Sequence, residues 1–494
     1  MNRTRTTTLA ALAAAVTLLA GCAVGPDFKR PDPPQADRYV AWPLKLERKD
    51  AGDQSQQAIL GGQLDRAWWR LFQSEALDAV VKRALAQNRT IVAASYTLAQ
   101  AQELAAAQAG TRYPQVGVAA GVGREKYGAE FLGSSPKPPP FTYFAVGPTV
   151  SYSLDYTGGG ARSIEQQLAR ASYQRQQLDA AYLAVTGNAV MQSLNIASLR
   201  AQIATVRTLL DQDRKNQKLV HEAFAAGSVS RLDIVSADSQ LASDSAQLPP
   251  LRQALSLARH ALALVLGQAP AERALPEFDL TRLRLPRRLP VSLPSELARR
   301  RPDILAAEAE LHAATAAVGV ATANLYPHID LSTSFAQQTT VAGRLFAEGS
   351  NGWSLIGGLV APIIDGGTLR AERRAAVDAM QASAAKYQQT VLTAFGQVAD
   401  SLQALAHDAE ALDAQTLAQG AARRNLELTR ISYREGNIGV LQVLDAERRY
   451  SQASLAYVRA RAQRYIDTAQ LFLALGGSGF EADGRPGRRT AHSD

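Results

Sequence analysis

Histidines could supply this chain with metal ligands or proton-transfer groups, because imidazole binds metals and titrates near neutral pH. The six histidines are widely separated: His221, His260, His312, His328, His407 and His492. None has the spacing of a metal-binding pair, and no motif for a nucleophilic serine, a zinc-binding helix or a phosphate-binding loop is present. Acidic residues are spread along helical stretches, with no obvious pair in a pocket. We therefore expect no catalysis, no metal site and no bound cofactor.

A single thiol offers a different chemistry. Cys22 is the only cysteine, so no disulfide can form within the chain. It follows Leu19-Ala20-Gly21, at the end of a short apolar stretch that a positively charged N-terminus precedes. Small residues let a peptidase approach the backbone, and the thiol can carry a diacylglyceryl group. This order resembles a bacterial lipobox, so we expect residues 1–21 to be a signal peptide and Cys22 to carry a covalent lipid.

The residue after Cys22 bears on the destination of the mature protein. Lipoproteins that stay in the inner membrane usually carry Asp at this position, and here it is Ala23. By resemblance to such lipoproteins, we expect lipid anchoring in the outer membrane. After the first twenty residues, no stretch looks apolar enough to cross a bilayer as a helix.

Charge and length narrow the function class further. The formal net charge is +8, but the basic residues are spread out, without a block of Lys and Arg interleaved with aromatic residues. We therefore expect no nucleic-acid partner. A chain of 494 residues exceeds the usual size of a single core, so two or more packed units are expected.

The stretch Tyr433–Tyr450 predicts the tip of a helical hairpin. A long Pro-free helical pattern reaches it, Gly436 and Gly439 interrupt the pattern, and a second helical pattern follows. Glycine suits such a turn because it takes a positive φ without steric cost. An earlier stretch, residues 224–237, repeats the arrangement, with Gly227 in the place of Gly436. The chain is therefore built from two copies, each with a long hairpin that ends at a glycine turn.

Each copy also contains a pair of strand-like segments with alternating polarity. We expect strands at Gln115–Glu125, Phe144–Leu154, His328–Ala336 and Trp353–Ile364. The proline-rich residues 133–140 separate the first two and suit neither a helix nor a central strand. Four strands cannot close a barrel, and their edges would remain unpaired. Strands of about ten residues in a lipoprotein indicate a transmembrane barrel that several chains share.

The helical segments carry apolar residues in steps that alternate between four and three. In the first copy these positions are Leu178, Tyr182, Val185, Ala189, Gln192, Ile196, Leu199, Ile203, Val206 and Leu210, and only the polar Gln192 breaks the apolar character. In the second copy they are Val391, Phe395, Val398, Leu402, Leu405, Ala409 and Leu412. A sustained period of about 3.5 predicts coiled-coil packing. One narrow seam would fit a dimeric coiled coil, whereas the Ala, Gln, Ser and Asn on the other faces favour helices with neighbours on both sides. A helix over Arg162–Ala226 would extend about 100 Å.

The expected fold is an α+β membrane protein with long coiled-coil α-hairpins and four β-strands per chain. A helical pattern also runs from Glu75 to Arg112, and Pro249-Pro250 should break the returning helix of the first copy only. The predicted division is a signal peptide at 1–21, a lipidated N-terminal arm at 22–72, the first repeat at 73–266, a Pro-rich linker at 267–294, the second repeat at 295–476 and a disordered tail at 477–494.

Three stretches resemble the outer membrane factors, which are TolC-like channels, and in particular their NodT-type lipoprotein branch of resistance-nodulation-division efflux systems. They are Ala298–Ile304 (Ala-Arg-Arg-Arg-Pro-Asp-Ile), the run from Gly319 to Pro327, and Gly436–Ala446. The resemblance covers residues 22–476. Members of this family form trimers with a 12-stranded β-barrel and a 12-helix α-barrel tunnel. The resemblance therefore implies a homotrimer, which agrees with four strands per chain.

The resemblance also implies a gate. In the family, the hairpin of the second copy lines the closed periplasmic end of the tunnel. Carried over by position, Leu441 would be an apolar constriction and Asp445 an acidic ring, although Asp445 could also be a solvated helix charge. Tyr433, Arg434 and Arg448 would be tethers that hold neighbouring hairpins together.

The two turns would form tips that dock a periplasmic adaptor protein. The tip residues are Gly227, Ser228, Leu232, Gly436 and Asn437. Some relatives carry a second acidic residue where this chain has Gln442, so the acidic ring would be single here. Strong cation binding at the tip is therefore not implied.

Three functions are compatible with these features. The resemblance favours an outer membrane channel of a tripartite efflux system, which carries drugs or other small toxic compounds from an inner-membrane proton-driven pump and a periplasmic adaptor. A channel for type I protein secretion or metal-ion efflux would share the fold, and gene neighbours would distinguish the two. A structural lipoprotein with a coiled-coil stalk would show no conductance in a planar bilayer. The substrate is not specified by this sequence, because the inner-membrane pump selects it.

Overall fold

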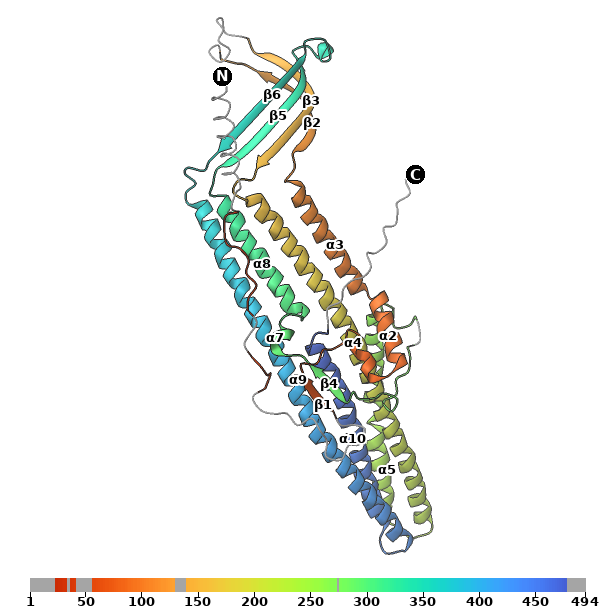
Figure 1. Ribbon diagram of the computed structural model, residues 1–494. Coiled ribbons are helices and arrows are strands. Elements are labelled where there is room, and N and C mark those ends of the chain that lie inside the picture. The colour runs from red at the N-terminus through yellow and green to blue at the C-terminus, as the bar shows by residue number, and fades with distance from the viewer. Residues whose placement is uncertain (1–22, 33–35, 41–55, 129–138, 273–274, 478–494) are drawn as a thin grey trace. The chain divides into compact units, whose positions relative to one another are not determined.

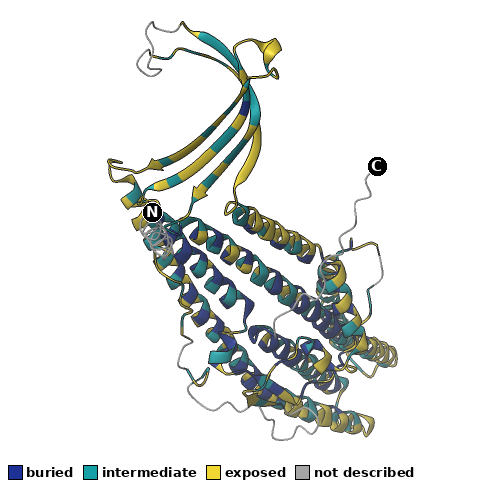
Figure 2. Ribbon diagram, turned by 45° about the horizontal axis from the view of Figure 1, so that its top comes forward, coloured by how far each residue is buried: buried dark blue, intermediate teal, exposed yellow. Residues whose placement is uncertain are grey.

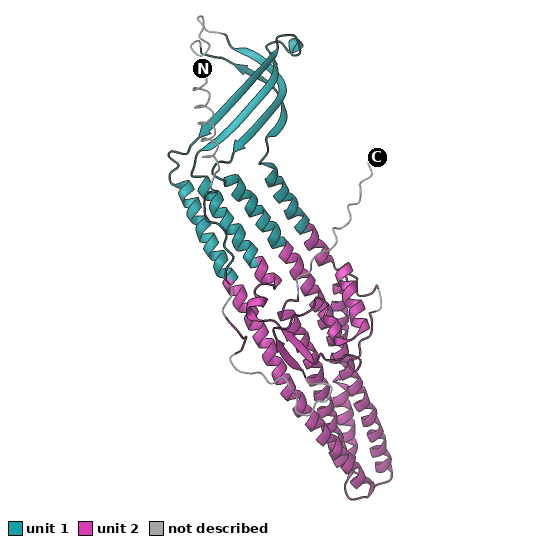
Figure 3. Cartoon of the chain, viewed as in Figure 1, with its two compact units in different colours: residues 1–31, 97–174, 307–387 teal, residues 32–96, 175–306, 388–494 magenta. Residues whose placement is uncertain are grey.

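The computed structural model describes residues 23–32, 36–40, 56–128, 139–272 and 275–477. This part of the chain is mostly helical, with two 67-residue helices, α4 (Gly159–Ala225) and α9 (Thr368–Arg434). The chain divides into two compact units, which Figure 3 shows in different colours. The first unit comprises residues 1–31, 97–174 and 307–387, and the second comprises 32–96, 175–306 and 388–494.

A four-stranded antiparallel sheet forms part of the first unit, in the order β2-β3-β5-β6 (Figure 1). The strands are β2 (Gln115–Glu125), β3 (Phe141–Leu154), β5 (His328–Thr339) and β6 (Asn351–Val360), with the short helix η4 (Ala342–Arg344) between the last two. The register places Val118 opposite Pro148 and Phe335 opposite Trp353. The outer strands β2 and β6 each pair along one side only, so the sheet has two open edges.

The ladder between β3 and β5 is interrupted at Gly147 and Pro148. Pro148 has no N–H to donate, which removes one ladder hydrogen bond. A Cβ on Gly147 would collide with the carbonyl oxygen of Phe335 on β5. Glycine is therefore required where the two strands approach each other most closely.

Large apolar side chains of the sheet are exposed rather than packed in a core. They include Val116, Val118, Val122, Trp353, Leu355 and Leu359. Figure 2 shows the strands mostly exposed or intermediate, whereas the buried residues gather on the helices. An apolar surface of this kind requires a lipid phase or a further protein surface to cover it.

The N-terminal segment of the first unit is fixed to the helices of that unit. The guanidinium of Arg162 on α4 donates to Asp27 at 2.5 Å. The ring of Phe28 stacks on His312 of α8 (Pro302–Ala323), with 4.2 Å between the ring centroids. These two contacts hold the segment around Asp27 and Phe28 against α4 and α8.

The second unit contains a helical core. Its further elements are η2 (Trp68–Phe72), α2 (Glu75–Gln87), α5 (Arg231–Ser245), α6 (Leu248–Val265), α7 (Pro294–Leu297) and α10 (Val440–Ala474), while α3 (Arg89–Gly110) contributes to both units. Strand β1 (Gln57–Leu60) pairs in parallel with β4 (Arg288–Val291). The buried Trp68 packs on Phe472, with ring centroids 5.6 Å apart. The Nε of the fully buried Arg464 donates to Gln56 at 2.8 Å, which ties the residues before β1 to α10.

The apolar repeat predicted for the long helices coincides with their buried sides. Val185, Ala189 and Ile203 on α4 and Val398 and Leu412 on α9 are all buried. The break at the tandem prolines is also confirmed, because α5 ends at Ser245 and α6 begins at Leu248. In the second copy, α10 is continuous, as predicted.

Three details differ from the sequence-based expectations. The helix expected over 75–112 is divided at Asn88, whose side-chain oxygen accepts from Thr90 N at 2.8 Å and caps α3. Strand β6 ends at Val360 rather than Ile364, because Pro362 cannot donate to a ladder. Helix α8 is long and apolar enough to pass as a membrane span by length and composition, although half of that window is buried inside the protein. A buried core helix passes the same test.

Candidate gate and docking site at the hairpin tips

Both hairpins turn at a glycine in the left-handed region, as the sequence predicts. Gly227 follows α4 with a φ of 75°, and Gly436 follows α9 with a φ of 78°. In each turn the next N–H, of Ser228 or of Asn437, donates back to a carbonyl in the last helical turn, at 2.9 and 3.0 Å. This is the Schellman arrangement, which a glycine at the helix end permits. The two copies therefore build their tips in the same way.

The returning helices begin differently in the two copies. Ser230 starts α5 with a capping box, in which both its N–H and its hydroxyl donate to the Asp233 carboxylate at 2.7 Å. Helix α10 begins after Gly439, which has no side chain for capping. An N-cap side chain contributes about 1 kcal/mol to helix stability. The start of α10 therefore has less local support than the start of α5.

The two tips lie together in the second unit and border one cavity of about 450 Å³. The lining residues are Gly227, Ser228, Val229, Ser230, Asp233, Gly439, Val440, Leu441 and Gln442. The structure thus brings the predicted docking residues Gly227 and Ser228 next to the predicted constriction residue Leu441. The other predicted docking residues, Leu232, Gly436 and Asn437, are exposed outside this cavity.

Leucine side chains are exposed at both tips. Leu441 is 42% exposed and Leu232 is 68% exposed. Contiguous exposed apolar patches mark interaction sites, whereas single exposed leucines are common on protein surfaces. The predicted tether Tyr433 is also exposed on the last turn of α9.

The predicted acidic residue has cationic partners on its own helix. Asp445 accepts from Arg448 at 2.6 Å and from Arg449 at 2.9 Å. The Nε of Arg434 donates to the carbonyl of Arg430 at 3.4 Å. Within one chain, therefore, Arg448 is already paired with a carboxylate. The cluster of two guanidinium groups and one carboxylate has a net positive charge. An acidic ring of unpaired Asp445 side chains would instead be negative.

A buried acid close to the candidate gate was missed from the sequence. Glu447 on α10 is only 4% exposed. It accepts from Arg430 of α9 at 2.7 Å and also from Asn216 of α4. Arg430 donates in turn to Gln212 of α4 at 2.6 Å. Glu447 lies one helical turn after the buried Val443 and therefore on the apolar side of the helix. That position was the sequence feature from which its burial could have been predicted.

Two pairs of acids that the sequence did not indicate lie at contacts between helices of the second unit. Burial, followed by the neighbouring Asp244, raises the pKa of Asp213 to about 7. Asp244 accepts hydrogen bonds from Gln240 at 2.6 Å and from Gln247 at 2.7 Å. Asp213 continues the apolar repeat three residues after Leu210, and this position could have indicated its burial.

The second pair is formed by Asp408 of α9 and Asp467 of α10. Burial, followed by the hydrogen bond with Asp467, raises the pKa of Asp408 to about 8. Asp467 accepts from Gln463 at 3.0 Å. Each pair joins the two helices of one hairpin in the second unit, α4 with α5 and α9 with α10.

Two of the candidate metal ligands, Cys22 and His492, lie outside the described residues. His312 contacts Glu165 at 2.9 Å and stacks on Phe28. Over the described ranges, no group of three or more His, Cys, Asp or Glu is arranged to hold a metal ion.

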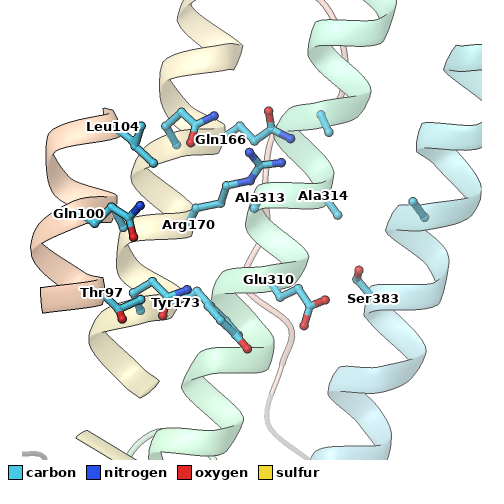
Figure 4. Close-up of a pocket in the computed structure, with 15 residues that line it drawn as sticks. Thr97, Gln100, Leu104, Gln166, Arg170, Tyr173, Glu310, Ala313, Ala314 and Ser383 are labelled. Atoms are coloured by element: carbon cyan, nitrogen blue, oxygen red, sulfur yellow. The ribbon is translucent and has the colours of Figure 1, made fainter. Parts of the chain in front are cut away.

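The first unit contains a cavity of about 660 Å³ that no sequence motif indicated. Figure 4 shows its lining side chains, which come from α3, α4, α8 and α9 and include Gln100, Gln166, Arg170, Glu310 and Ser383. Glu310 pairs with Lys386 at 3.7 Å. Alanine and glutamine account for nine of the fifteen lining residues.

Comparison with known proteins identifies the family. The model of the family described as "Outer membrane efflux protein" matches residues 80–268 and 293–477. The pyoverdine export outer membrane protein OpmQ of Pseudomonas aeruginosa is 32% identical over 425 residues, which cover 85% of this chain and 88% of OpmQ. The outer membrane protein OprJ of the same species is 30% identical over 473 residues, 95% of each chain. The probable outer membrane lipoprotein SilC of Salmonella typhimurium is 25% identical, over 94% of this chain and 98% of SilC.

Solved structures agree with this assignment. The outer-membrane channel OprN is similar with a TM-score of 0.82 and 28% identity, over 92% of this chain and 99% of OprN. The open state of the MtrE outer membrane channel of Neisseria gonorrhoeae gives a TM-score of 0.75 and 25% identity, over 92% and 98% of the two chains. The protein described here belongs to the outer membrane efflux protein family.

Proposed function

We propose that this protein is the outer membrane channel of a tripartite efflux system. It carries drugs or other small toxic compounds that an inner-membrane proton-driven pump and a periplasmic adaptor deliver. The observation that carries the proposal is the four-stranded sheet with two open edges and exposed apolar side chains, in one chain with two long helical hairpins. A passage of this kind needs no catalytic step and no cofactor.

The open edges of β2 and β6 support a homotrimer. In hydrocarbon, each unpaired N–H or C=O costs several kcal/mol, so an open sheet does not persist in a membrane. Pairing the β6 edge of one copy with the β2 edge of the next closes the sheet and removes every edge. Three copies give the 12-stranded barrel and the 12-helix periplasmic tunnel that the family resemblance implies.

The proposed division of the chain follows from its interpretation as an outer membrane channel. Residues 1–21 are removed, and 22–72 form an arm whose Cys22 carries the lipid. Residues 73–266 and 295–476 are the two repeats, 267–294 link them, and 477–494 are a tail. The exposed apolar strands supply most of the affinity for the outer membrane, and the lipid adds a second anchor.

The proposed gate lies at the tip of the second hairpin. Leu441 closes the tunnel by apolar contact with its symmetry copies, and Asp445 lies one turn further along α10. Tyr433, Arg434 and Arg448 hold neighbouring hairpins together. The adaptor docks on the two glycine turns, where the exposed Leu232 and the tip cavity offer apolar and polar contacts.

Two measurements test this function. The purified protein should have the mass of a trimer in mild detergent and should conduct ions in a planar bilayer. A strain without the gene should become more susceptible to exported compounds, and the intact gene should restore resistance. A monomer that keeps its full β signal in detergent, or a trimer without conductance, would contradict the proposal.

A further inference from the structure

A cavity of about 710 Å³ in the second unit gathers cationic side chains. Five arginines line it: Arg70, Arg284, Arg287, Arg288 and Arg461. Among the described residues that line it, none is acidic. Leu283, Leu285, Pro286 and Tyr465 supply apolar and aromatic surface. No part of the proposed channel function requires this concentration of guanidinium groups.

Backbone contacts hold the elements around the cavity in place. Arg284 N donates to the carbonyl of Phe72 at 3.1 Å, which fixes the linker against η2. The hydroxyl of Tyr465 on α10 donates to the carbonyl of Leu283 at 2.9 Å. Arg288 begins β4 and pairs with Gln57 of β1. Main-chain hydrogen bonds and strand pairing therefore hold the backbone at Arg284 and Arg288 in place.

Among the described residues, only some of the cavity's arginines have a carboxylate partner. Arg70 donates to Asp78 at 3.0 Å. Arg284 and Arg288 have no carboxylate partner in the described part of the chain. The Nε of Arg461 is buried and has no hydrogen-bond acceptor among the described atoms. Like charges at close range repel unless an anion offsets them, and a buried donor without an acceptor is unfavourable.

We propose that this cavity binds an anion with two or more phosphate or carboxylate groups. The planar guanidinium fork matches the two oxygens of either group and forms charge-assisted hydrogen bonds with them. A multivalent anion can reach several of the five arginines at once, and the apolar surface accommodates its carbon or ester portion. The site is separate from the hairpin tips, and the channel function stands without it.

Isothermal titration calorimetry on the full-length protein in detergent tests this site. Inorganic pyrophosphate and citrate are the probes, and acetate at equal ionic strength is the monovalent control. Binding of one probe per chain, weaker in high salt, is expected. Binding of pyrophosphate alone indicates a phosphate source, citrate alone indicates a carboxylate source, and competition between the two indicates a general site. Each of these results supports the proposal.

Variants separate this site from general attraction to a basic protein. Arg284→Gln together with Arg288→Gln should weaken binding at least about tenfold, because two charge-assisted contacts are lost. Arg214→Gln together with Arg282→Gln is the matched control, since both arginines are exposed and neither lines the cavity. Arg284→Lys with Arg288→Lys keeps the charge but not the fork, and should bind with intermediate strength. Unchanged thermal unfolding without probe would show that each variant folds.

Two results would overturn the proposal. Equal binding by the Gln double variant and its control would mean an adventitious ion only. Absence of binding by both probes would remove the site.

Discussion

The carboxylate of Glu447 on α10 accepts two hydrogen bonds from the guanidinium of Arg430 on α9, at 3.2 Å from Nε and 2.7 Å from Nη2. This pair joins the two helices of the second hairpin. Asn216 of α4 donates to the same carboxylate and brings in the first hairpin. Glu447 lies two residues after the proposed gate residue Asp445, on the buried side of the helix. A hairpin that swings at the gate must therefore carry this network with it or break it.

Replacing Glu447 by Gln should destabilise the protein by about 1–3 kcal/mol, because a charge-assisted contact with a buried carboxylate becomes a neutral one. Thermal unfolding of the purified protein measures the loss. Glu435→Gln is the matched control, since Glu435 is exposed and bonds only to Asn437, at 3.3 Å. Its effect should stay within about 0.5 kcal/mol. Equal losses of stability in the two variants would show that the buried contact with Arg430 contributes no more to stability than an exposed contact does.

The Asp213 and Asp244 pair predicts that stability depends on pH. The pKa of Asp213 is about 7 in the folded protein, whereas an unfolded aspartate titrates near about 4. Between these values the folded state binds more protons, so this group's contribution to stability falls as the pH rises from about 4 to about 7. Asp213→Asn imitates the neutral carboxyl and should remove this contribution. The variant should gain stability relative to the natural protein at pH 8 and little at pH 5.

Thermal unfolding at a series of pH values measures this difference. Asp211→Asn, an exposed aspartate of the same helix that pairs with Arg214, is the control and should keep the natural slope. Asp408, with a pKa of about 8, adds a slope of the same sign and should leave a residual dependence in both variants. An Asp213→Asn profile parallel to the natural one would show that Asp213 is ionised when folded.

Replacing Cys22 by Ser should block lipidation while trimers still form. The exposed apolar strands supply most of the membrane affinity, and a single lipid anchor holds only marginally by itself. Incorporation of labelled palmitate and the migration of unheated samples on a gel measure the two effects separately. A variant that still incorporates palmitate would contradict the lipid assignment, and a strictly monomeric one would show that the lipid is needed for assembly.

The sequence predicted features that depend on local pattern. The turns at Gly227 and Gly436 followed from glycine placement, and the buried positions Val185 and Val398 followed from the 3.5-residue repeat. The strands were placed to within a few residues for the same reason. Hydrophobic periodicity and turn preferences depend on residues that are close together in the sequence, so no tertiary information was needed.

Features that depend on distant partners were missed. The break at Asn88 relies on its side chain, which caps α3 and also donates to the carbonyl of Val265 at 2.8 Å. The acidic pair of Asp213 and Asp244 forms only when α4 and α5 pack together. The arginine cavity combines residues from η2, the linker and α10, which are far apart in the sequence. In each case the polar side chain, considered without its partners, resembled an ordinary surface residue.

The last prediction concerns the proposed gate. Arg434→Ser together with Arg448→Ser should raise the resting conductance of the purified trimer and admit large antibiotics without a pump. In this variant Asp445 keeps Arg449 as a partner, at 2.9 Å, so its negative charge remains offset. The contacts that the variant removes are therefore the proposed ones between neighbouring hairpins. Exposed ion pairs contribute about 0–1 kcal/mol each, so the closed state is held by a symmetric sum of weak contacts. A closed state of that strength suits a channel that an adaptor opens.

Leu441→Ser tests the apolar part of the same gate and should also raise conductance, because it replaces an exposed leucine by a side chain that water solvates. Arg423→Ser is the control for loss of charge, since Arg423 is exposed on α9 and pairs with Glu427 of the same helix, at 3.0 Å. Its single-channel conductance should equal that of the natural protein. If the double arginine variant and Leu441→Ser also kept the natural conductance, the constriction would have to lie at residues other than these.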